Sequence, residues 1–315
     1  MISDHSNCNH LWSACPTPLT PKFEIDEDSL HRSVEWQHSH GIEGLFVAGT
    51  SGEGACLTDS AIDLLTRKTV EYSAGRMPVS VQVTDNSIDR VLDRVRRAQQ
   101  SGGSLVTLAP PLFEVGVTDN SLRHFYGEIL DRSPLPVCIY QLPRKTLLPT
   151  AFIEETCAHP NLRMIKDSTG DAARQTLVFA AAGKRSDLVV LTGIEIGYYD
   201  DYIRGFHGGL LGTAILNAKW ALAMHAAISA GDHRLAKAIS DHMSDFMLAI
   251  FGGKSIQSWM GGLKMCLHRM GIFTSTTSYY DMPPTEEVQE SIEDLVARKF
   301  WVYDPSLVGS ETKAS

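Results

Sequence analysis

The amino-acid sequence predicts an α/β protein that folds as a closed (β/α)8 TIM barrel with an appended C-terminal helical segment. Eight short runs rich in β-forming residues recur along the 315-residue chain, and a helical pattern follows each of them without a linker or a shift of composition. Such alternation is typical of a parallel sheet, and eight units fit a closed barrel. An open, doubly wound sheet is the alternative. The runs span residues 11–15, 44–48, 78–83, 104–109, 136–140, 162–166, 188–192 and 208–213.

The residues within and between these runs support the alternation. Several runs are continuously apolar, as strands covered on both faces are. The stretch DEDSLHRSVEWQHSHG places Leu30, Val34 and Trp36 near one helical face and ends at Gly41. In TDSAIDLLTRKTVEYSAG, Thr58 is the expected N-cap. TDNSIDRVLDRVRRAQQSGG repeats the scheme, from a polar cap to two glycines.

Beyond residue 214 the pattern is helical over most of the remaining chain. The stretches from AILNAKWALAMHAAISAG to SIEDLVARKFW indicate the eighth barrel helix and then further helices, which pack on the barrel or build an oligomer contact. We therefore expect a flexible N-terminus over residues 1–10, the barrel over 11–230, and a helical extension packed on the barrel over 231–315.

The composition argues against several classes of function. A formal net charge of −9, from 28 basic and 37 acidic residues, argues against a nucleic-acid-binding face. No apolar run reaches the length of a membrane span and no signal peptide is evident, so we expect a cytoplasmic protein with no membrane partner. The 6 cysteines are scattered without a CxxC pair, and the 12 histidines lack metal-ligand spacing. Reduced thiols and no metal site are therefore expected.

Lys166 and Tyr140 are the strongest candidates for catalysis, because active-site residues of such barrels lie at the carboxyl ends of strands. Lys166 closes the apolar run LRMIK, where burial lowers the pKa of a lysine and frees its amine to form a Schiff base with a carbonyl. Tyr140 ends the preceding run, and its phenol can exchange protons with a substrate held there. The alternatives are a lysine that reaches solvent or pairs with Asp167, and a tyrosine that packs on the rim.

The stretch VAGTSGEGACLTD, after the second run, is close to two glycine-rich motifs and fits neither. Gly49 and Gly54 have the spacing of a phosphate-binding P-loop, but Ala55 and Cys56 replace its lysine and its hydroxyl residue. Glu53 occupies the last glycine position of a Gly-x-Ser-x-Gly nucleophile elbow. Neither phosphate binding nor a serine nucleophile is therefore expected here.

The polar groups that remain in this turn suit a small carboxylate. Thr50 and Ser51 offer hydroxyls beside a row of backbone N–H groups that starts at Gly49. A tight turn in which the glycines serve only the backbone is the alternative. Glu195, after the seventh run, and Leu211, in the run HGGLLGT, are further candidates for substrate contact. HGGLLGT has no adjacent lysine or arginine, which favours close backbone packing over phosphate binding.

Taken in order, these strand ends resemble the motifs of the dihydrodipicolinate synthase / N-acetylneuraminate lyase family of pyruvate-dependent class I aldolases. The resemblance covers roughly residues 11–300. The family motifs Gly-Thr-Thr-Gly-Glu, Tyr-Asn-x-Pro, Ile-Lys-x-x-x-Gly and Thr-Pro correspond here to Gly49-Thr50-Ser51-Gly52-Glu53, Tyr140-Gln141-Leu142-Pro143, Ile165-Lys166-Asp167-Ser168-Thr169-Gly170 and Thr17-Pro18.

The resemblance implies a lyase or aldolase, or a dehydratase, in which Lys166 forms a Schiff base with pyruvate or with a sugar-derived 2-oxo acid. Tyr140 would transfer protons to the aldehyde or hydroxyl oxygen of the second substrate. No cofactor or metal is implied beyond the lysine, and family members are commonly homo-oligomers, either tetramers or dimers. The substrate carboxylate would be held by Gly49, Thr50 and Ser51, in a loop supported by Thr17 and Glu53.

Two departures from the family pattern bear on the substrate. Family synthases carry Thr-Pro-Tyr-Tyr after strand four, where this chain has Ala109-Pro110-Pro111-Leu112-Phe113 and no hydroxyl. Synthases also place an arginine five residues after the strand-five tyrosine, where this chain has Lys145, preceded by Arg144. These departures favour an aldolase or dehydratase for a sugar-derived acid. The alternatives are 4-hydroxy-tetrahydrodipicolinate synthase, which condenses pyruvate with aspartate semialdehyde, and a non-catalytic 2-oxo acid binding homologue.

Overall fold

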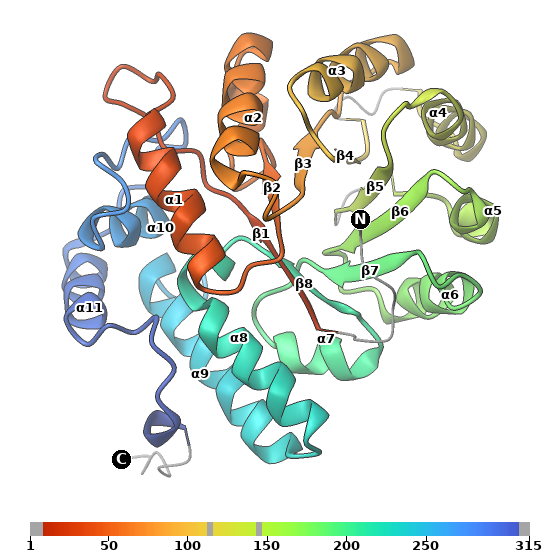
Figure 1. Cartoon of the computed structure of the whole chain (residues 1–315). Coiled ribbons are helices and arrows are strands. Elements are labelled where there is room, and N and C mark those ends of the chain that lie inside the picture. The colour runs from red at the N-terminus through yellow and green to blue at the C-terminus, as the bar shows by residue number, and fades with distance from the viewer. Residues whose placement is uncertain (1–8, 112–115, 143–146, 309–315) are drawn as a thin grey trace.

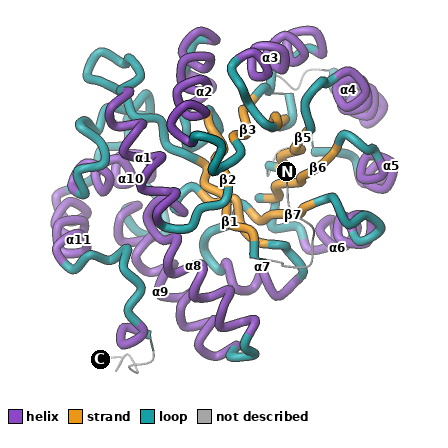
Figure 2. The backbone as a smooth tube through the Cα atoms, in the orientation of Figure 1, coloured by secondary structure: helices purple, strands orange, loops and turns teal. Residues whose placement is uncertain are grey.

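The computed structural model describes residues 9–111, 116–142 and 147–308, and these residues form the predicted barrel. The strands are parallel and close in sequence order, because β1 pairs with both β2 and β8 (Figure 1). Helices surround the strands (Figure 2), so the predicted fold class is confirmed. The strands are β1 (His10–Ala14), β2 (Gly44–Val47), β3 (Val79–Gln82), β4 (Leu105–Leu108), β5 (Val137–Gln141), β6 (Leu162–Asp167), β7 (Val189–Thr192) and β8 (Gly208–Leu211).

Among the described residues, one α-helix follows each strand, and three more lie beyond the barrel. The barrel helices are α1 (Glu27–Ser39), α2 (Asp59–Ser73), α3 (Ile88–Gln100), α4 (Asp119–Arg132), α5 (Ile153–Ala158), α6 (Ala172–Ala182), α7 (Tyr198–Arg204) and α8 (Ala214–Ser229). The C-terminal segment adds α9 (His233–Phe251), α10 (Trp259–Arg269) and α11 (Glu286–Ala297). Short 3-10 turns are η1 (Gly54–Cys56), η2 (Thr150–Phe152) and η3 (Pro305–Leu307).

Polar side chains set where many of these helices begin, because they accept hydrogen bonds from N–H groups that a helix leaves unpaired. Thr58, the expected N-cap of α2, accepts from the backbone N–H of Ala61 at 3.2 Å. Gly41, the expected end of α1, has a φ of 87°, a left-handed value that glycine adopts without strain. The other side-chain caps are Asp26, Ser87, Thr118, Asp171, Asp232 and Thr285.

Side chains alternate between the barrel interior and the helix layer along each strand. On β2, Phe46 belongs to the interior cluster, whereas Leu45 and Val47 belong to the larger cluster between strands and helices. The barrel is therefore a packed core, and only the inward positions at its carboxyl rim are left for a site. The interior cluster consists of Trp12, Ala14, Phe46, Leu105, Cys138, Met164, Val189, Leu191 and Leu210.

The C-terminal helices α9, α10 and α11 lie beside α1 and α8 (Figure 1). They form a second hydrophobic cluster with the first turn of α8, which contributes Ile215. Trp36 on α1 donates from Nε1 to the carbonyl oxygen of Ile215 at 2.8 Å, and Arg32 donates from Nε to that of Ile272 at 3.0 Å. The expected boundary near residue 230 falls between α8 and α9, while β1 already begins at His10. Residues 1–8 lie outside the described residues.

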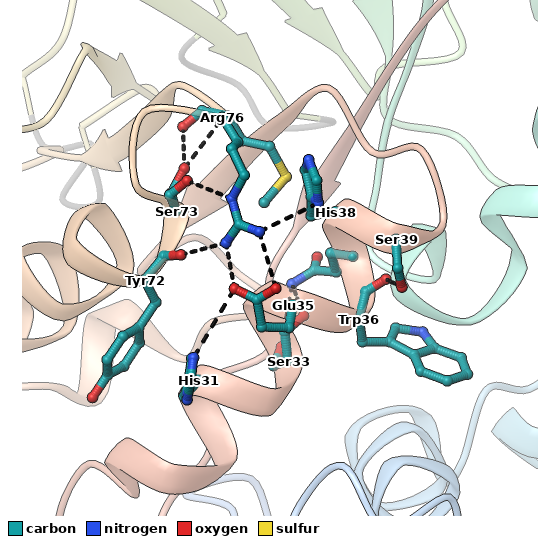
Figure 3. Close-up of polar contacts among 11 residues, drawn as sticks. His31, Ser33, Glu35, Trp36, His38, Ser39, Tyr72, Ser73 and Arg76 are labelled. Carbon is teal, nitrogen blue, oxygen red and sulfur yellow. Dashed lines mark hydrogen bonds and ion pairs between the residues drawn. The ribbon is translucent and has the colours of Figure 1, made fainter.

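Arg76, in the turn between α2 and β3, joins α1 to α2 (Figure 3). Its guanidinium donates from Nη1 to Glu35 Oε2 at 3.0 Å and from Nη2 to the carbonyl oxygen of Tyr72 at 2.7 Å. The hydrogen bond from Arg76 lowers the pKa of the Glu35 carboxyl group. Because this turn precedes β3, the cluster lies at the amino end of the strands, and we assign it to the fold rather than to the site.

A buried histidine on α8 is expected to make stability depend on pH. His225 is 1% exposed, its Nε2 lies 2.7 Å from the Tyr198 hydroxyl oxygen, and burial lowers its pKa to about 4. In the unfolded chain the pKa of histidine is about 6.5. As the pH falls through this window, the unfolded state takes up a proton that the folded state does not, so stability is lost. From this group alone, the free energy of unfolding should fall by about 2 kcal/mol between about pH 7.5 and about pH 5.

Urea titrations at both pH values check this prediction, with the His225→Gln variant as the control. Glutamine keeps a polar partner near Tyr198 and does not titrate. The variant should therefore lose about 2 kcal/mol less than the wild type over the same interval. Equal losses in the two proteins would assign the pH dependence to other groups.

Candidate active site

Lys166 lies inside the barrel at the carboxyl end of β6. Met164, two residues earlier, belongs to the interior cluster, and side chains two apart on a strand share a face. β5 pairs with β6 so that Tyr140 lies beside Lys166. Lys166 Nζ is 4.2 Å from the centroid of the Tyr140 ring and 5.5 Å from that of the Phe46 ring. Lys166 and Tyr140 are only 5% and 6% exposed, so the amine is enclosed and faces aromatic rings.

Gly193, directly after β7, leaves the space that the Lys166 side chain occupies. A Cβ at this position would lie 2.5 Å from Lys166 Cε and 2.1 Å from Ser168 Oγ, closer than real Cβ contacts come. The glycine is therefore needed for room beside the lysine. Nothing in the sequence marked Gly193 for this role, because a glycine after a strand is equally typical of a plain turn.

Glu195 connects the ends of β7 and β8. Its carboxylate accepts from the backbone N–H of Thr213 at 2.8 Å and from the Thr213 hydroxyl at 2.9 Å. Burial raises the pKa of Glu195, although the hydrogen bonds from Thr213 and the positive charge of Lys166 oppose the shift. Glu195 therefore takes up a proton more readily than an ordinary glutamate.

The turn after β2 is tightly constrained. Glu53 has a left-handed φ of 54°, which is uncommon outside glycine. A Cβ on the next residue, Gly54, would lie 1.7 Å from the carbonyl oxygen of Ala48, so the chain can pass only with a glycine there. Thr17 donates from its hydroxyl to the carbonyl oxygen of Gly52 at 2.6 Å. These contacts support the predicted role of Thr17 and Glu53 in holding the loop.

The two hydroxyls of this turn lie in different surroundings. Ser51 is 8% exposed and lies next to Gly212, where an added Cβ would be 2.7 Å from Ser51 Oγ and 3.1 Å from Glu195 Oε1. Thr50 is exposed and, together with Gly49, lines a cavity of about 280 Å³ that also borders Gln82 on β3 and Ala109 directly after β4. Ser51 is therefore the hydroxyl that adjoins Glu195 and the end of β8.

Leu211 lies apart from this group, and the remaining sequence candidates fall outside the described residues. Leu211 is fully buried in the layer between strands and helices, one residue after the inward-facing Leu210. Its alternation turns it away from the barrel interior, so this geometry gives no support for a substrate contact by Leu211. Arg144 and Lys145 lie outside the described residues, as does the segment Leu112-Phe113.

Lys264 on α10 is a site neighbour that sequence reasoning missed. It is fully buried and pairs with Glu53, which is also fully buried. Burial lowers the pKa of Lys264, and the Glu53 carboxylate opposes the shift. The only signal in the sequence was a lysine in the largely apolar helical stretch GGLKMCL, which is equally typical of a side chain that reaches solvent.

Within residues 9–111, 116–142 and 147–308, no group of three or more histidine, cysteine, aspartate or glutamate side chains is arranged to hold a metal ion. In the same part of the chain, no helix has the length and apolar character needed to cross a bilayer.

Comparison with known proteins shows to which family the chain belongs. Residues 7–299 match the model of the dihydrodipicolinate synthetase family. The chain belongs to this family. Among curated family members, a 4-hydroxy-tetrahydrodipicolinate synthase from Rhizobium meliloti is 29% identical over 292 residues, which cover 90% of this chain and 96% of the relative. The protein of the same name from Hyphomonas neptunium is 30% identical over 261 residues, covering 82% and 87%.

Solved structures of the family share the fold. The dihydrodipicolinate synthase of Bacteroides thetaiotaomicron superposes with a TM-score of 0.84 at 24% identity, covering 92% of this chain and 98% of the other. A prophage protein of the family from E. coli K12, solved in complex with pyruvate, gives a TM-score of 0.81 at 18% identity, covering 93% and 99%. The predicted family is confirmed, and with it the predicted enzyme class, a class I pyruvate-dependent lyase or aldolase.

Proposed function

We propose that this protein is a Schiff-base lyase that acts on pyruvate or on a sugar-derived 2-oxo acid through Lys166. The observation that carries the proposal is the position of the Lys166 amine. It lies buried inside the barrel, 4.2 Å from the Tyr140 ring centroid and in the space left by Gly193. A carbonyl compound that enters the rim meets this amine beside Ser51 and Glu195.

The reaction begins when the neutral amine attacks the C2 carbonyl of the 2-oxo acid. The carbonyl oxygen leaves as water, and the protonated imine that results draws electrons from C3. In a 4-hydroxy-2-oxo acid the C3–C4 bond then breaks. Its electron pair forms an enamine, the C4 hydroxyl loses its proton, and an aldehyde departs. Protonation at C3 and addition of water to the imine release pyruvate and restore the amine.

The surrounding side chains suit the steps of this reaction. Tyr140 is the proposed carrier of the C4 hydroxyl proton, because its ring lies against the lysine and a phenol can act as acid or base. Ser51 and the backbone of its turn are the proposed carboxylate holders. Glu195 is the proposed partner of substrate hydroxyls, because its carboxyl group lies at the ends of β7 and β8, next to Ser51. This last feature favours a hydroxylated, sugar-derived acid.

A second candidate function is 4-hydroxy-tetrahydrodipicolinate synthase. The curated relatives at 29% and 30% identity carry this name, which favours condensation of pyruvate with aspartate semialdehyde. The sequence after β4 argues against it, because Leu112 and Phe113 stand where synthases carry tyrosines. The two candidates share the Lys166 chemistry and differ in the aldehyde and in whether the C–C bond is broken or formed.

Two experiments test these proposals. Reduction with borohydride in the presence of pyruvate, followed by intact mass measurement, should give one adduct per chain. Folded protein without an adduct would rule out both enzymes and leave a non-catalytic 2-oxo acid binder. A panel of 4-hydroxy-2-oxo sugar acids, assayed for pyruvate release, should then show faster turnover than pyruvate with aspartate semialdehyde. The reverse order of rates would establish the synthase.

Tyr140→Phe is expected to separate Schiff-base formation from proton transfer. The variant should still trap pyruvate on Lys166 under borohydride, because the amine and its surroundings are kept. Turnover should fall by about 10²- to 10⁴-fold, the usual contribution of a positioned acid or base. Steady-state pyruvate release measures the loss, with Tyr72→Phe on the surface of α2 as the matched control. Turnover within a few-fold of the wild type would remove Tyr140 from the mechanism.

A further inference from the structure

Glu53 ties the turn after β2 to the C-terminal helical segment. Its carboxylate forms an ion pair with Lys264 on α10, and both side chains are 0% exposed. Glu53 Oε2 also accepts from the Ser278 hydroxyl at 2.8 Å and from the backbone N–H of Tyr279 at 2.5 Å. Lys264 donates in turn to the carbonyl oxygen of Thr277 at 2.6 Å. One acid from the barrel rim is thus held by three groups that follow the barrel in the chain.

A buried ion pair such as Glu53–Lys264 contributes little net stability to a fold. Two charges taken out of water lose their hydration, and a hydrophobic pair of similar volume often serves stability equally well or better. The geometry here points to positioning instead. The Ser278 hydroxyl and the Tyr279 N–H both donate to the Glu53 carboxylate, which also pairs with Lys264. Thr277 holds Lys264 in turn through its carbonyl oxygen, so the position of the carboxylate is well defined.

The position of the Glu53 carboxylate constrains the backbone conformation of the turn. Glu53 adopts a left-handed φ of 54°, a conformation that persists in a non-glycine residue only when its surroundings enforce it. Its backbone N–H donates to the carbonyl oxygen of Thr50 at 3.1 Å, which closes the turn around Ser51. An anchor on Glu53 therefore fixes the direction in which Ser51 and the neighbouring N–H groups point.

We infer that Lys264 is a positioning residue for substrate binding, which acts through Glu53 on the carboxylate-holding turn. The C-terminal helical segment then contributes to the active site, because Lys264 belongs to α10. The inference rests on the proposed function, in which Ser51 and its turn bind the carboxylate of a 2-oxo acid held on Lys166. It concerns how tightly the substrate is held, whereas Lys166 and Tyr140 determine the chemistry.

The test uses the full-length chain and pyruvate as the probe. In the double variant Glu53→Gln/Lys264→Met, both charges are removed together and no unpaired charge is left in the interior. Its folded state is checked by circular dichroism and urea titration. We expect the pyruvate concentration that gives half-maximal borohydride trapping to rise by about tenfold, because the binding turn is no longer fixed. The final amount of adduct at saturating pyruvate should stay that of the wild type.

Ser278→Ala is the second variant, for the case that the double variant does not fold. It removes one hydrogen bond to Glu53 and leaves both charges in place. We expect a rise of about threefold in the same half-maximal concentration, because a single neutral hydrogen bond contributes less than the whole anchor. Lys237→Met is the matched control, because its pair with Asp241 on α9 is exposed, and it should bind pyruvate as the wild type does.

Each outcome bears on the inference. A folded double variant or a Ser278→Ala variant with wild-type half-saturation would mean that the ion pair serves the fold alone, while the proposed function stands. An adduct that is lost at every pyruvate concentration in a folded double variant would also contradict it, because the pair would then act on the chemistry. If the wild type itself forms no adduct, the proposed function fails and this inference fails with it.

Discussion

Replacing Lys166 with alanine is expected to abolish the pyruvate adduct and to lower turnover by about 10⁴-fold or more, the range seen when a covalent nucleophile is removed. The reason is geometric: the amine lies buried at the barrel rim, over the rings of Tyr140 and Phe46. Without it the imine cannot form, so C3 has no electron sink. Intact mass after borohydride reduction measures the adduct, and pyruvate release measures the turnover.

The main competitor for the adduct is Lys264, which with Lys166 is one of the two buried lysines among the described residues. In the ion pair with Glu53 its nitrogen is an ammonium, which has no lone pair with which to attack a carbonyl, and it also donates to the carbonyl oxygen of Thr277. Peptide mapping should therefore place the adduct on Lys166. Lys184→Ala, at an exposed pair with Glu154, is the control that should keep both adduct and turnover. An adduct that persists in Lys166→Ala and maps to Lys264 would overturn the assignment.

Much of the architecture could be predicted because it depends on local patterns. Apolar runs alternating with capped helical stretches require a parallel sheet, and their regular number predicts closure into a barrel. Closure brings all carboxyl ends of the strands to one rim. Lys166 and Tyr140 end successive strands, and parallel pairing in register then places them side by side. Their proximity follows from the topology alone.

The rest could not be predicted because it depends on exact register and on distant contacts. A shift of one residue along a strand turns a side chain to the other face, and Leu211 lies on the helix side for this reason. Thr50 and Ser51 are adjacent in one turn, yet Thr50 is exposed whereas Ser51 is buried. Glu53 meets Tyr279 across 226 residues of sequence, and no local pattern announces such a contact.

Gly193→Ala should disable the enzyme although it adds only one methyl group. The new Cβ would lie 2.5 Å from Lys166 Cε and 2.1 Å from Ser168 Oγ, so the lysine must move. A nucleophile displaced by about 1 Å can lose about 10²-fold in rate, and we expect at least this drop in the rate of borohydride-trapped adduct formation. Crowding of this kind in a packed region also costs about 1–3 kcal/mol of stability. Time-resolved trapping with pyruvate, together with urea titration, measures both effects.

Gly127→Ala is the matched control, because the same methyl group is added where it meets nothing. Gly127 lies in the middle of α4, and an added Cβ has no heavy atom within 4 Å apart from its chain neighbours and the backbone of its own helix. Alanine is favoured over glycine inside a helix by about 1 kcal/mol, so this variant should be more stable and fully active. If the folded Gly193→Ala variant traps pyruvate at the wild-type rate, the Lys166 side chain has more space than the structure shows. The placement of the Lys166 side chain, and every role assigned around it, would then need revision.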